Sequence, residues 1–285
     1  TELYMQGLGP HKFIHKTLKG KKKFIGSAFY AKSMNDLNKL SKTEDFSEVK
    51  KLKSPGGGFV VEALDPDGLK VEVIFGMKTK KFNKKDLVAE PFNSGGIGKE
   101  TSPRKNQPRR VGKPRSSKIK KLGHLAINVN DPSVSFDWYN KHLGLIPSDK
   151  VELGKGSGIY VALFCRCDLG NKLTDHHSFL LQSNLSSDLK SGFNHCAYEV
   201  VEVDDIFLGH EVLKDKRYRH EWGIGRHFAG SQIFDYWRSP YGHVHQTDGD
   251  LFDNKVKPGV IDISEAAGMQ WGPDITATFG NSEGV

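Results

Sequence analysis

The chain has 285 residues, 36% of them hydrophobic, and it lacks the apolar run of about 18 residues that a membrane-spanning helix needs, so we expect no membrane partner. Its three cysteines cannot form a disulfide framework, which favours a reducing, cytoplasmic location. The net charge of +8 comes from residues 78–121, where fifteen Lys and Arg face three Asp and Glu, a local +12 that leaves −4 for the rest. This stretch lacks the interleaved aromatic residues that stack on bases, so no nucleic-acid partner is expected.

Residues 1–77 are expected to form an N-terminal, non-catalytic domain of the βαβββ type. A strand is predicted near Glu2–Gln6. A hairpin is predicted over 63–72, where Pro66 fits the second turn position and Gly68 follows two residues later. The segment is shorter than a complete unit by roughly one β-α-β piece. We therefore expect that this domain is truncated at its start.

A basic linker rich in Pro and Gly is predicted for residues 78–121. Residues 122–252, which follow it, predict two successive βαβββ modules, and residues 253–285 are expected to be a C-terminal tail. The predicted fold class is therefore α+β, with paired βαβββ modules in two domains.

The first of the two modules opens with Leu122–Asn130, in which apolar and polar residues alternate as in a half-buried strand. Asp131 can cap the helix that follows, Pro132 suits its first turn, and Gly144 can end it. The apolar residues expected on or near its buried face are Val134, Trp138 and Leu143. Two further strands are predicted near 158–165 and 177–182.

The second module repeats this plan, with a strand at Phe193–Val201 and a helix near Val203–Lys214. Its closing strands are predicted at 232–237 and 243–246. The turn between those strands repeats the Pro and Gly spacing of the first hairpin, which indicates a weak internal repeat. His210 and His220 lie in the helix-to-loop region and are expected to be exposed to solvent.

Two strand-borne histidines, His124 and His195, recur near the start of the first strand of each module. Either one alone is more often a satisfied core or surface residue, but their equivalent positions in a repeated unit favour metal ligation. An iron(II) oxygenase site needs two neutral imidazoles and one anionic ligand on one face of the metal. The third ligand is expected at Gln246, four residues after the turn glycine, where a carboxylate would be the expected residue. Asp248 and Asp250 are alternative anionic ligands if the chain folds back.

Four further stretches accompany the two histidine strands: Asp175–Leu181, Trp222–His227, Gly230–Arg238 and Ser239–Gly242. With them, the chain resembles the vicinal oxygen chelate superfamily and, more narrowly, the type I extradiol dioxygenases that cleave catechol rings. Two motifs near the end of the chain are similar to the trihydroxytoluene oxygenase-like branch: Asp248–Asp250 and Gln270–Pro273.

The resemblance implies the glyoxalase/extradiol dioxygenase fold, with residues 122–252 as the catalytic, metal-binding domain and Fe(II), or alternatively Mn(II), as the metal. His124 and His195 match the two histidine ligands. Gln246 occupies the position of the glutamate ligand and departs from the family pattern, which puts the third ligand in doubt.

The resemblance also implies three catalytic residues. His177, the second histidine of a pair, matches the acid/base that handles protons near dioxygen, whereas His176 is expected to point away because adjacent strand residues face opposite sides. His227 matches the histidine that hydrogen-bonds the substrate, and Tyr236 matches the tyrosine that contacts a substrate hydroxyl oxygen.

The implied function is cleavage of a catechol or trihydroxybenzene-type aromatic diol by dioxygen at a mononuclear non-heme metal, in a homo-oligomer. Two alternatives stay open because Gln246 replaces the expected glutamate. One is another metal-assisted reaction on the same fold, such as an isomerisation. The other is a non-catalytic aromatic-binding protein. The presence of His177, His227 and Tyr236 as a set favours the dioxygenase, because a binding protein does not need them together.

Overall fold

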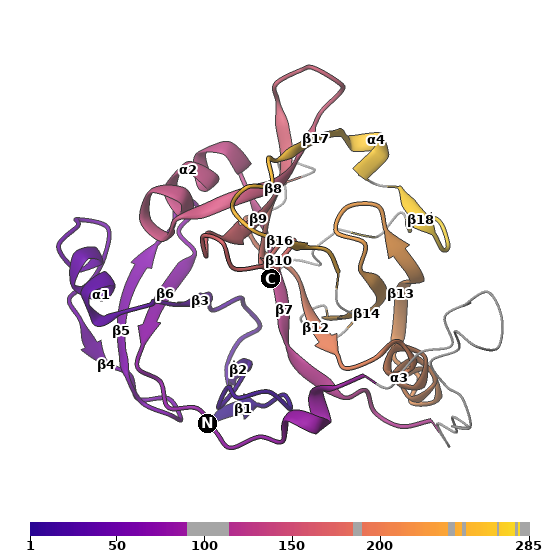
Figure 1. The fold of residues 1–285 in the computed structure, drawn as a ribbon, viewed down its shortest axis with the longest axis horizontal. Helices are drawn as coiled ribbons and strands as arrows, with labels where there is room; N and C mark the ends of the chain where they lie inside the picture. Colours follow the sequence, from indigo (N-terminus) through magenta and orange to yellow (C-terminus); the bar gives the residue numbers. More distant parts are fainter. Residues whose placement is uncertain are drawn as a thin grey trace.

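The computed structural model describes residues 1–89, 114–184, 190–238, 243–246, 249–266, 268–276 and 279, with residues 243–246 described by their backbone alone. In this part of the chain, a four-stranded sheet and a ten-stranded sheet are accompanied by two two-stranded ribbons. Figure 1 shows the small sheet, in violet, beside the larger one. None of the described helices combines the length and the apolar character needed to cross a membrane. The predicted cytoplasmic location stays a prediction.

The N-terminal part contains a ribbon and the small sheet. The ribbon pairs β1 (Glu2–Met5), at the predicted first strand, with β2 (His15–Leu18). The sheet has the order β3-β6-β5-β4, and its elements are β3 (Ser27–Tyr30), α1 (Met34–Leu40), β4 (Lys50–Lys51), β5 (Phe59–Leu64) and β6 (Lys70–Phe75). The predicted hairpin joins β5 to β6. Gly68 adopts φ 77° in its turn and donates its N–H to the carbonyl oxygen of Asp65 at 2.9 Å.

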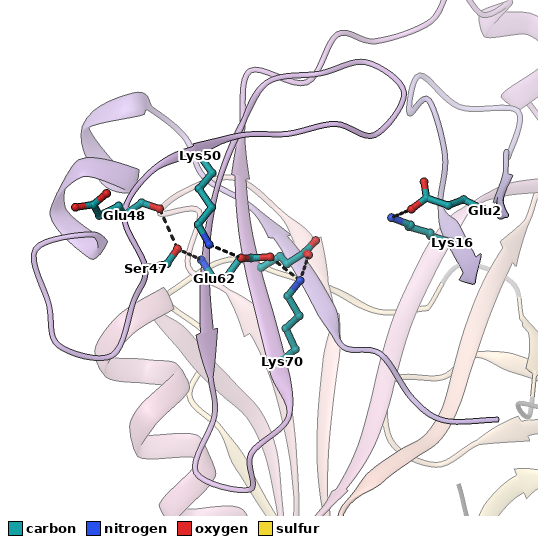
Figure 2. Close-up of polar contacts among 8 residues, drawn as sticks. Glu2, Lys16, Ser47, Glu48, Lys50, Glu62 and Lys70 are labelled. Carbon is teal, nitrogen blue, oxygen red and sulfur yellow. Dashed lines mark hydrogen bonds and ion pairs between the residues drawn. The ribbon is translucent and has the colours of Figure 1, made fainter. Parts of the chain in front are cut away.

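An ion-pair cluster crosses the outer side of this small sheet (Figure 2). Glu62 on β5 contacts Lys50 on β4 at 2.9 Å and Lys70 on β6 at 2.5 Å. Hydrogen bonds from Lys70 and Lys50 lower the pKa of the Glu62 carboxyl. All three side chains are partly exposed, so the cluster selects the strand neighbours while adding little to the free energy of folding.

The large sheet has the strand order β17-β8-β9-β11-β7-β12-β15-β14-β13-β18. Its strands in chain order are β7 (Ile119–Val129), β8 (Leu145–Glu152), β9 (Tyr160–Cys167), β11 (Phe179–Ser183), β12 (Gly192–Val200), β13 (Arg219–His227), β14 (Ile233–Arg238), β15 (His243–Gln246), β17 (Gly259–Asp262) and β18 (Met269–Trp271). The helices α2 (Pro132–Leu143) and α3 (Val203–Asp215) connect β7 to β8 and β12 to β13. Each half is thus one βαβββ module, as predicted, and the halves meet where β7 pairs antiparallel with β12.

Four short elements complete the described chain. They are η1 (Lys84–Leu87), β10 (Thr174–Asp175), β16 (Leu251–Phe252) and α4 (Ile263–Ala266). Most of the predicted linker, residues 90–113, lies outside the described residues. The segment expected to be a tail contributes β17 and β18, which pair with β8 and β13. The proposed domain limits therefore cut through a sheet that the C-terminal segment completes at both edges.

The helix α2 begins and ends where the sequence predicts. The Asp131 carboxylate accepts the N–H of Ser133 at 2.8 Å, and Gly144 takes the left-handed conformation at the C-terminal end. The predicted buried face is partly wrong, because Val134 is 54% exposed while Tyr139 is buried. The buried row of this helix includes Ser135 and Tyr139, four residues apart.

The two parts of the chain share one hydrophobic core. Val71 of the small sheet is fully buried in a cluster with residues of β7, α2 and β11. Phe29 packs edge-to-face on Phe179 with ring centroids 5.4 Å apart. The Tyr139 hydroxyl donates to the buried carboxylate of Asp65 at 2.9 Å. The N-terminal sheet therefore supports the strands that carry the candidate site.

We expect the Tyr139→Phe variant to lower the free energy of unfolding by about 1–2 kcal/mol, because the buried Asp65 carboxylate loses a hydrogen-bond donor that no water can replace. Urea unfolding of the full chain measures the change. Tyr218→Phe is the matched control, since Tyr218 is 51% exposed and should change by less than about 0.5 kcal/mol. Equal effects of the two substitutions would show that the Asp65 contact does not join the two parts.

Candidate metal centre and active site

The candidate centre lies where β7 and β12 pair. His124 on β7 is opposite Ala197 on β12, and His195 lies two residues before Ala197, so the two histidines are diagonal neighbours on one face of the sheet. They are 3% and 7% exposed, and their Nε2 atoms lie 3.0 Å apart. The structure thus brings the two sequence-predicted histidine ligands together, with the same ring nitrogen of each directed at the other.

The chemistry of these two rings fits a divalent metal. Burial lowers the pKa of His124 well below its ordinary value and that of His195 to about 4, so both are neutral at pH 7. The Nδ1 of His195 contacts Asn194 Oδ1 at 2.8 Å, which leaves its Nε2 as the lone-pair nitrogen. Two nitrogen ligands with bonds of roughly 2.1 Å at right angles to one another lie roughly 3 Å apart. The observed separation of 3.0 Å matches that arrangement.

The third predicted metal ligand, Gln246, is described by its backbone alone. Gln246 on β15 lies beside Glu199 of β12 and Phe234 of β14 in the sheet register, and its side chain lies outside the described residues. Asp248 also lies outside them. Asp250, the other alternative ligand, is exposed and accepts a hydrogen bond from Ser231 Oγ at 3.1 Å. The ligand role of Gln246 therefore stays a prediction.

His177 lies against His124, one of the two candidate ligands. Its ring centroid is 4.2 Å from that of His124, it is 4% exposed, and burial lowers its pKa well below the ordinary value. The expectation that His176 points away is wrong, because its Nδ1 lies 3.0 Å from Nδ1 of His177. Both residues fall in the loop between β10 and β11, where strand alternation does not apply.

A partly exposed carboxylate orients the histidine pair. Asp149 Oδ2 on β8 lies 2.7 Å from His176 Nε2, and the carboxylate accepts that N–H. When His176 is neutral, its Nδ1 then accepts the Nδ1–H of His177, so His177 keeps a lone pair on Nε2. Gly259 of β17 pairs with Asp149, and a Cβ there would lie 2.3 Å from Asp149 Oδ1. A residue without a side chain at position 259 therefore leaves room for the Asp149 carboxylate.

His227 and Tyr236 form the opposite wall. His227 ends β13 and Tyr236 lies on β14, and the Tyr236 hydroxyl is 3.0 Å from His227 Nε2. Burial lowers the pKa of His227 to about 3 and raises that of the Tyr236 phenol. The Tyr236 ring lies 5.5 Å from His195. The three predicted catalytic residues and the two predicted histidine ligands thus lie together in one cluster of neighbouring side chains.

Two aromatic residues that the sequence did not single out complete this wall. Trp222 stacks on Tyr236 with centroids 5.4 Å apart, and its Nε1 donates to the carbonyl oxygen of Pro273 at 2.8 Å. Phe279 packs on both Tyr236 and Trp222, with ring centroids 4.9 Å from each. Trp222 is buried, and its position inside the stretch similar to known dioxygenases was the one signal available for it.

Comparison with known proteins supports the predicted resemblance. Residues 121–246 match the model of the Glyoxalase/Bleomycin resistance protein/Dioxygenase superfamily. This match covers the paired βαβββ modules and the two histidines at their junction, and it agrees with the predicted likeness to vicinal oxygen chelate proteins.

Individual relatives narrow the comparison. Metapyrocatechase 2 of Cupriavidus necator is 26% identical over 249 residues, which cover 82% of this chain and 71% of that protein. The Mn(II)-bound glyoxalase from Novosphingobium aromaticivorans has a TM-score of 0.74 at 19% identity, covering 99% of this chain and 84% of that one. Homoprotocatechuate 2,3-dioxygenase from Arthrobacter globiformis has a TM-score of 0.73 at 16% identity, covering 99% and 80%. These structures confirm the predicted fold, and the trihydroxytoluene oxygenase-like branch stays a prediction.

We expect the metal-free protein to lose stability as the pH falls from about 7.5 to about 5.5. The buried histidines that stay neutral in the folded protein at both pH values are His124, His177, His195 and His227. Unfolded histidines have a pKa of about 6.5 and bind protons in this window. Because the folded pKa values are lowered, the unfolded state binds more protons, and the free energy of unfolding falls by about 1.4 kcal/mol per histidine.

Urea unfolding at the two pH values in the presence of a chelator measures this loss. The His195→Gln variant removes one such group, so its pH dependence should be smaller by about 1.4 kcal/mol. An unfolding free energy that is the same at both pH values would contradict the burial of these neutral imidazoles.

Proposed function

We propose that this protein is a ring-cleaving extradiol dioxygenase. It would use dioxygen to open a catechol or trihydroxybenzene-type aromatic ring at a mononuclear Fe(II), with Mn(II) as the alternative metal. The observation that carries the proposal is the 3.0 Å approach of His124 and His195 Nε2 beside His177 and the His227–Tyr236 pair. The names of two relatives, Metapyrocatechase 2 and homoprotocatechuate 2,3-dioxygenase, support the same class of reaction.

The metal would be held by His124 and His195 and, at the third corner, by the amide oxygen of Gln246. Bound Fe(II) supplies a site where an aromatic diol and dioxygen are held side by side. Two neutral imidazoles and a neutral amide leave the full charge of a divalent ion uncompensated. A deprotonated diol compensates it, so this donor set favours binding of the substrate as an anion.

His177 is the residue in position to move protons. With its Nδ1–H donated to His176, its Nε2 accepts a proton from a diol hydroxyl at the face where His124 lies. Burial lowers the pKa of His177, so the ring returns this proton readily to a more basic oxygen at a later stage. Asp149 keeps the pair in this tautomer through His176 Nε2.

The aromatic wall suits a flat ring. Tyr236 and His227 offer one hydroxyl and one ring nitrogen at the edge of the space, whereas Trp222 and Phe279 supply apolar ring surface beside them. Tyr236 stays protonated because burial raises its pKa, so its hydroxyl can donate to a substrate oxygen anion. The predicted homo-oligomer stays a prediction.

We expect the Fe(II)-loaded protein to consume dioxygen with a catechol or trihydroxybenzene and to form a coloured ring-opened product. Gln246→Glu should raise the affinity for Fe(II) by roughly tenfold or more, because an anionic ligand replaces a neutral one. An oxygen electrode and a metal-binding titration measure the two effects. Gln270→Glu is the matched control, since it adds the same charge at an exposed position on β18.

The outcomes separate the three candidate functions. Oxygen consumption by the natural protein supports the proposal, whereas consumption by Gln246→Glu alone would show that the natural protein has lost or changed this chemistry. Anaerobic turnover of a diol would instead indicate another metal-assisted reaction. Diol binding without metal or turnover in either protein would indicate a non-catalytic aromatic-binding protein, and both of these results overturn the proposal.

We expect Asp149→Asn to lower kcat by roughly 10–100-fold with little change in KM, because the amide no longer fixes the tautomer of His176 and His177. The pH profile of kcat should shift as well, which a merely structural role would not cause. Asp215→Asn, at an exposed position at the end of α3, is the matched control. If both variants keep the parent profile, the carboxylate does not act through His177.

A further inference from the structure

A second group of metal-ligand residues lies on the opposite face of β14 from the candidate active site. Asp235 directly precedes Tyr236 on this strand, so the two side chains point to opposite faces. His210 on α3 and His220 on β13 both contact the Asp235 carboxylate. His220 is exposed, as expected, whereas His210 is only partly exposed, and a helix and a strand place both on a common partner.

The distances within this group are short. His220 Nε2 is 2.8 Å from Asp235 Oδ1, and His210 Nδ1 is 3.1 Å from Asp235 Oδ2. One ligand atom from each of the three residues can be chosen so that all lie within 4.8 Å of one another. The carboxylate is fully buried, while the side chains of His210 and His220 are 21% and 33% exposed. Solvent can thus reach the group from the histidine side.

The Asp235 carboxylate also accepts a hydrogen bond from Trp237. Trp237 Nε1, on the same face of β14, donates to Asp235 Oδ2 at 2.6 Å. Such a donor fixes the orientation of a ligating carboxylate in protein metal sites. Among the described residues, the ion-pair partners of Asp235 are the two histidines, and the Trp237 N–H is the further donor to its carboxylate. A buried anion bordered by two imidazoles is a setting in which a divalent cation is stabilising.

We propose that His210, His220 and Asp235 form a second metal site, for a divalent ion of the Zn(II) type. Two imidazole nitrogens and one carboxylate oxygen are a donor set that Zn(II) accepts, with water as the fourth ligand. Ligand atoms around a tetrahedral ion with bonds of roughly 2.0–2.1 Å lie roughly 3.3 Å apart. Both histidines reach the same oxygen, Asp235 Oδ1, at 2.8 Å from His220 Nε2 and 3.2 Å from His210 Nδ1, so these distances need to lengthen by only a few tenths of an ångström.

An ion at this place connects three elements. It joins α3 to β13 and β14, on the face of the sheet that lies behind Tyr236. Because it binds the folded arrangement alone, it stabilises the fold by mass action. The proposal is independent of the dioxygenase assignment, since it uses none of the residues of the candidate active site.

The test counts Zn(II) equivalents by isothermal titration calorimetry and equilibrium dialysis of the full chain. His220→Gln is the central variant, because its amide N–H can still donate to Asp235 while a metal ligand is lost. His195→Ala removes the other candidate centre. We expect two equivalents for the parent, one for each single variant and none for the double variant. Zn(II) should also raise the Tm of His195→Ala, by roughly 5–10 °C at saturation, and leave the double variant unchanged.

Asp45→Asn supplies the matched control. Asp45 pairs with His142 Nε2 at 3.0 Å, which is a histidine–carboxylate contact without a second histidine. This substitution should leave the number of Zn(II) equivalents unchanged. If His220→Gln binds as many equivalents as the parent, or if His195→Ala shows no Zn(II)-dependent rise in Tm, the group is a hydrogen-bonded cluster alone and the proposal is overturned.

Discussion

The antiparallel pairing of β7 with β12 is the constraint on which the candidate site depends. Between Phe193 and His195 the register shifts, so that Asn194 is an extra residue on β12. From His195 to Ala197 the register is regular, so His195 lies on the same face as His124, one diagonal step away across the strand pair. Asn194 in turn contacts His195 Nδ1. A slip of one residue would turn one imidazole to the other face and separate the two nitrogens.

This pairing also explains which parts of the site the sequence could predict. His124 and His195 occupy equivalent places in two copies of one unit, and the copies meet at their first strands, so equivalence in sequence becomes proximity in space. The Asp131 cap and the Gly68 turn were predictable for a different reason, because each depends on residues within a few positions along the chain. These features were predictable because each follows from a repeated or a local signal in the sequence.

The rest depends on contacts that no local pattern carries. β13 was not predicted, because its sequence is rich in Gly and charged residues, yet it places both His220 and His227. Asp149 contacts His176 from β8, and the position of β8 beside the site is set by the order of strands in the sheet. The orientation of His176 and His177 was predicted from the alternation of side chains along a strand. These two residues lie in a loop, so that alternation does not apply to them. Long-range register, rather than composition, decides all of these placements.

The fold also sets where neutral and charged side chains lie around the candidate site. The described inner residues of the site are neutral imidazoles and a phenol, and the carboxylates stand one layer further out, as Asp149 does behind His176. A divalent ion between His124 and His195 would then keep most of its charge in a buried space, which is costly unless an anion accompanies it. With Gln246 as the proposed third ligand, the diol would itself be the anion that completes the proposed site. Metal affinity and substrate affinity are then linked, and each should strengthen the other by the same factor.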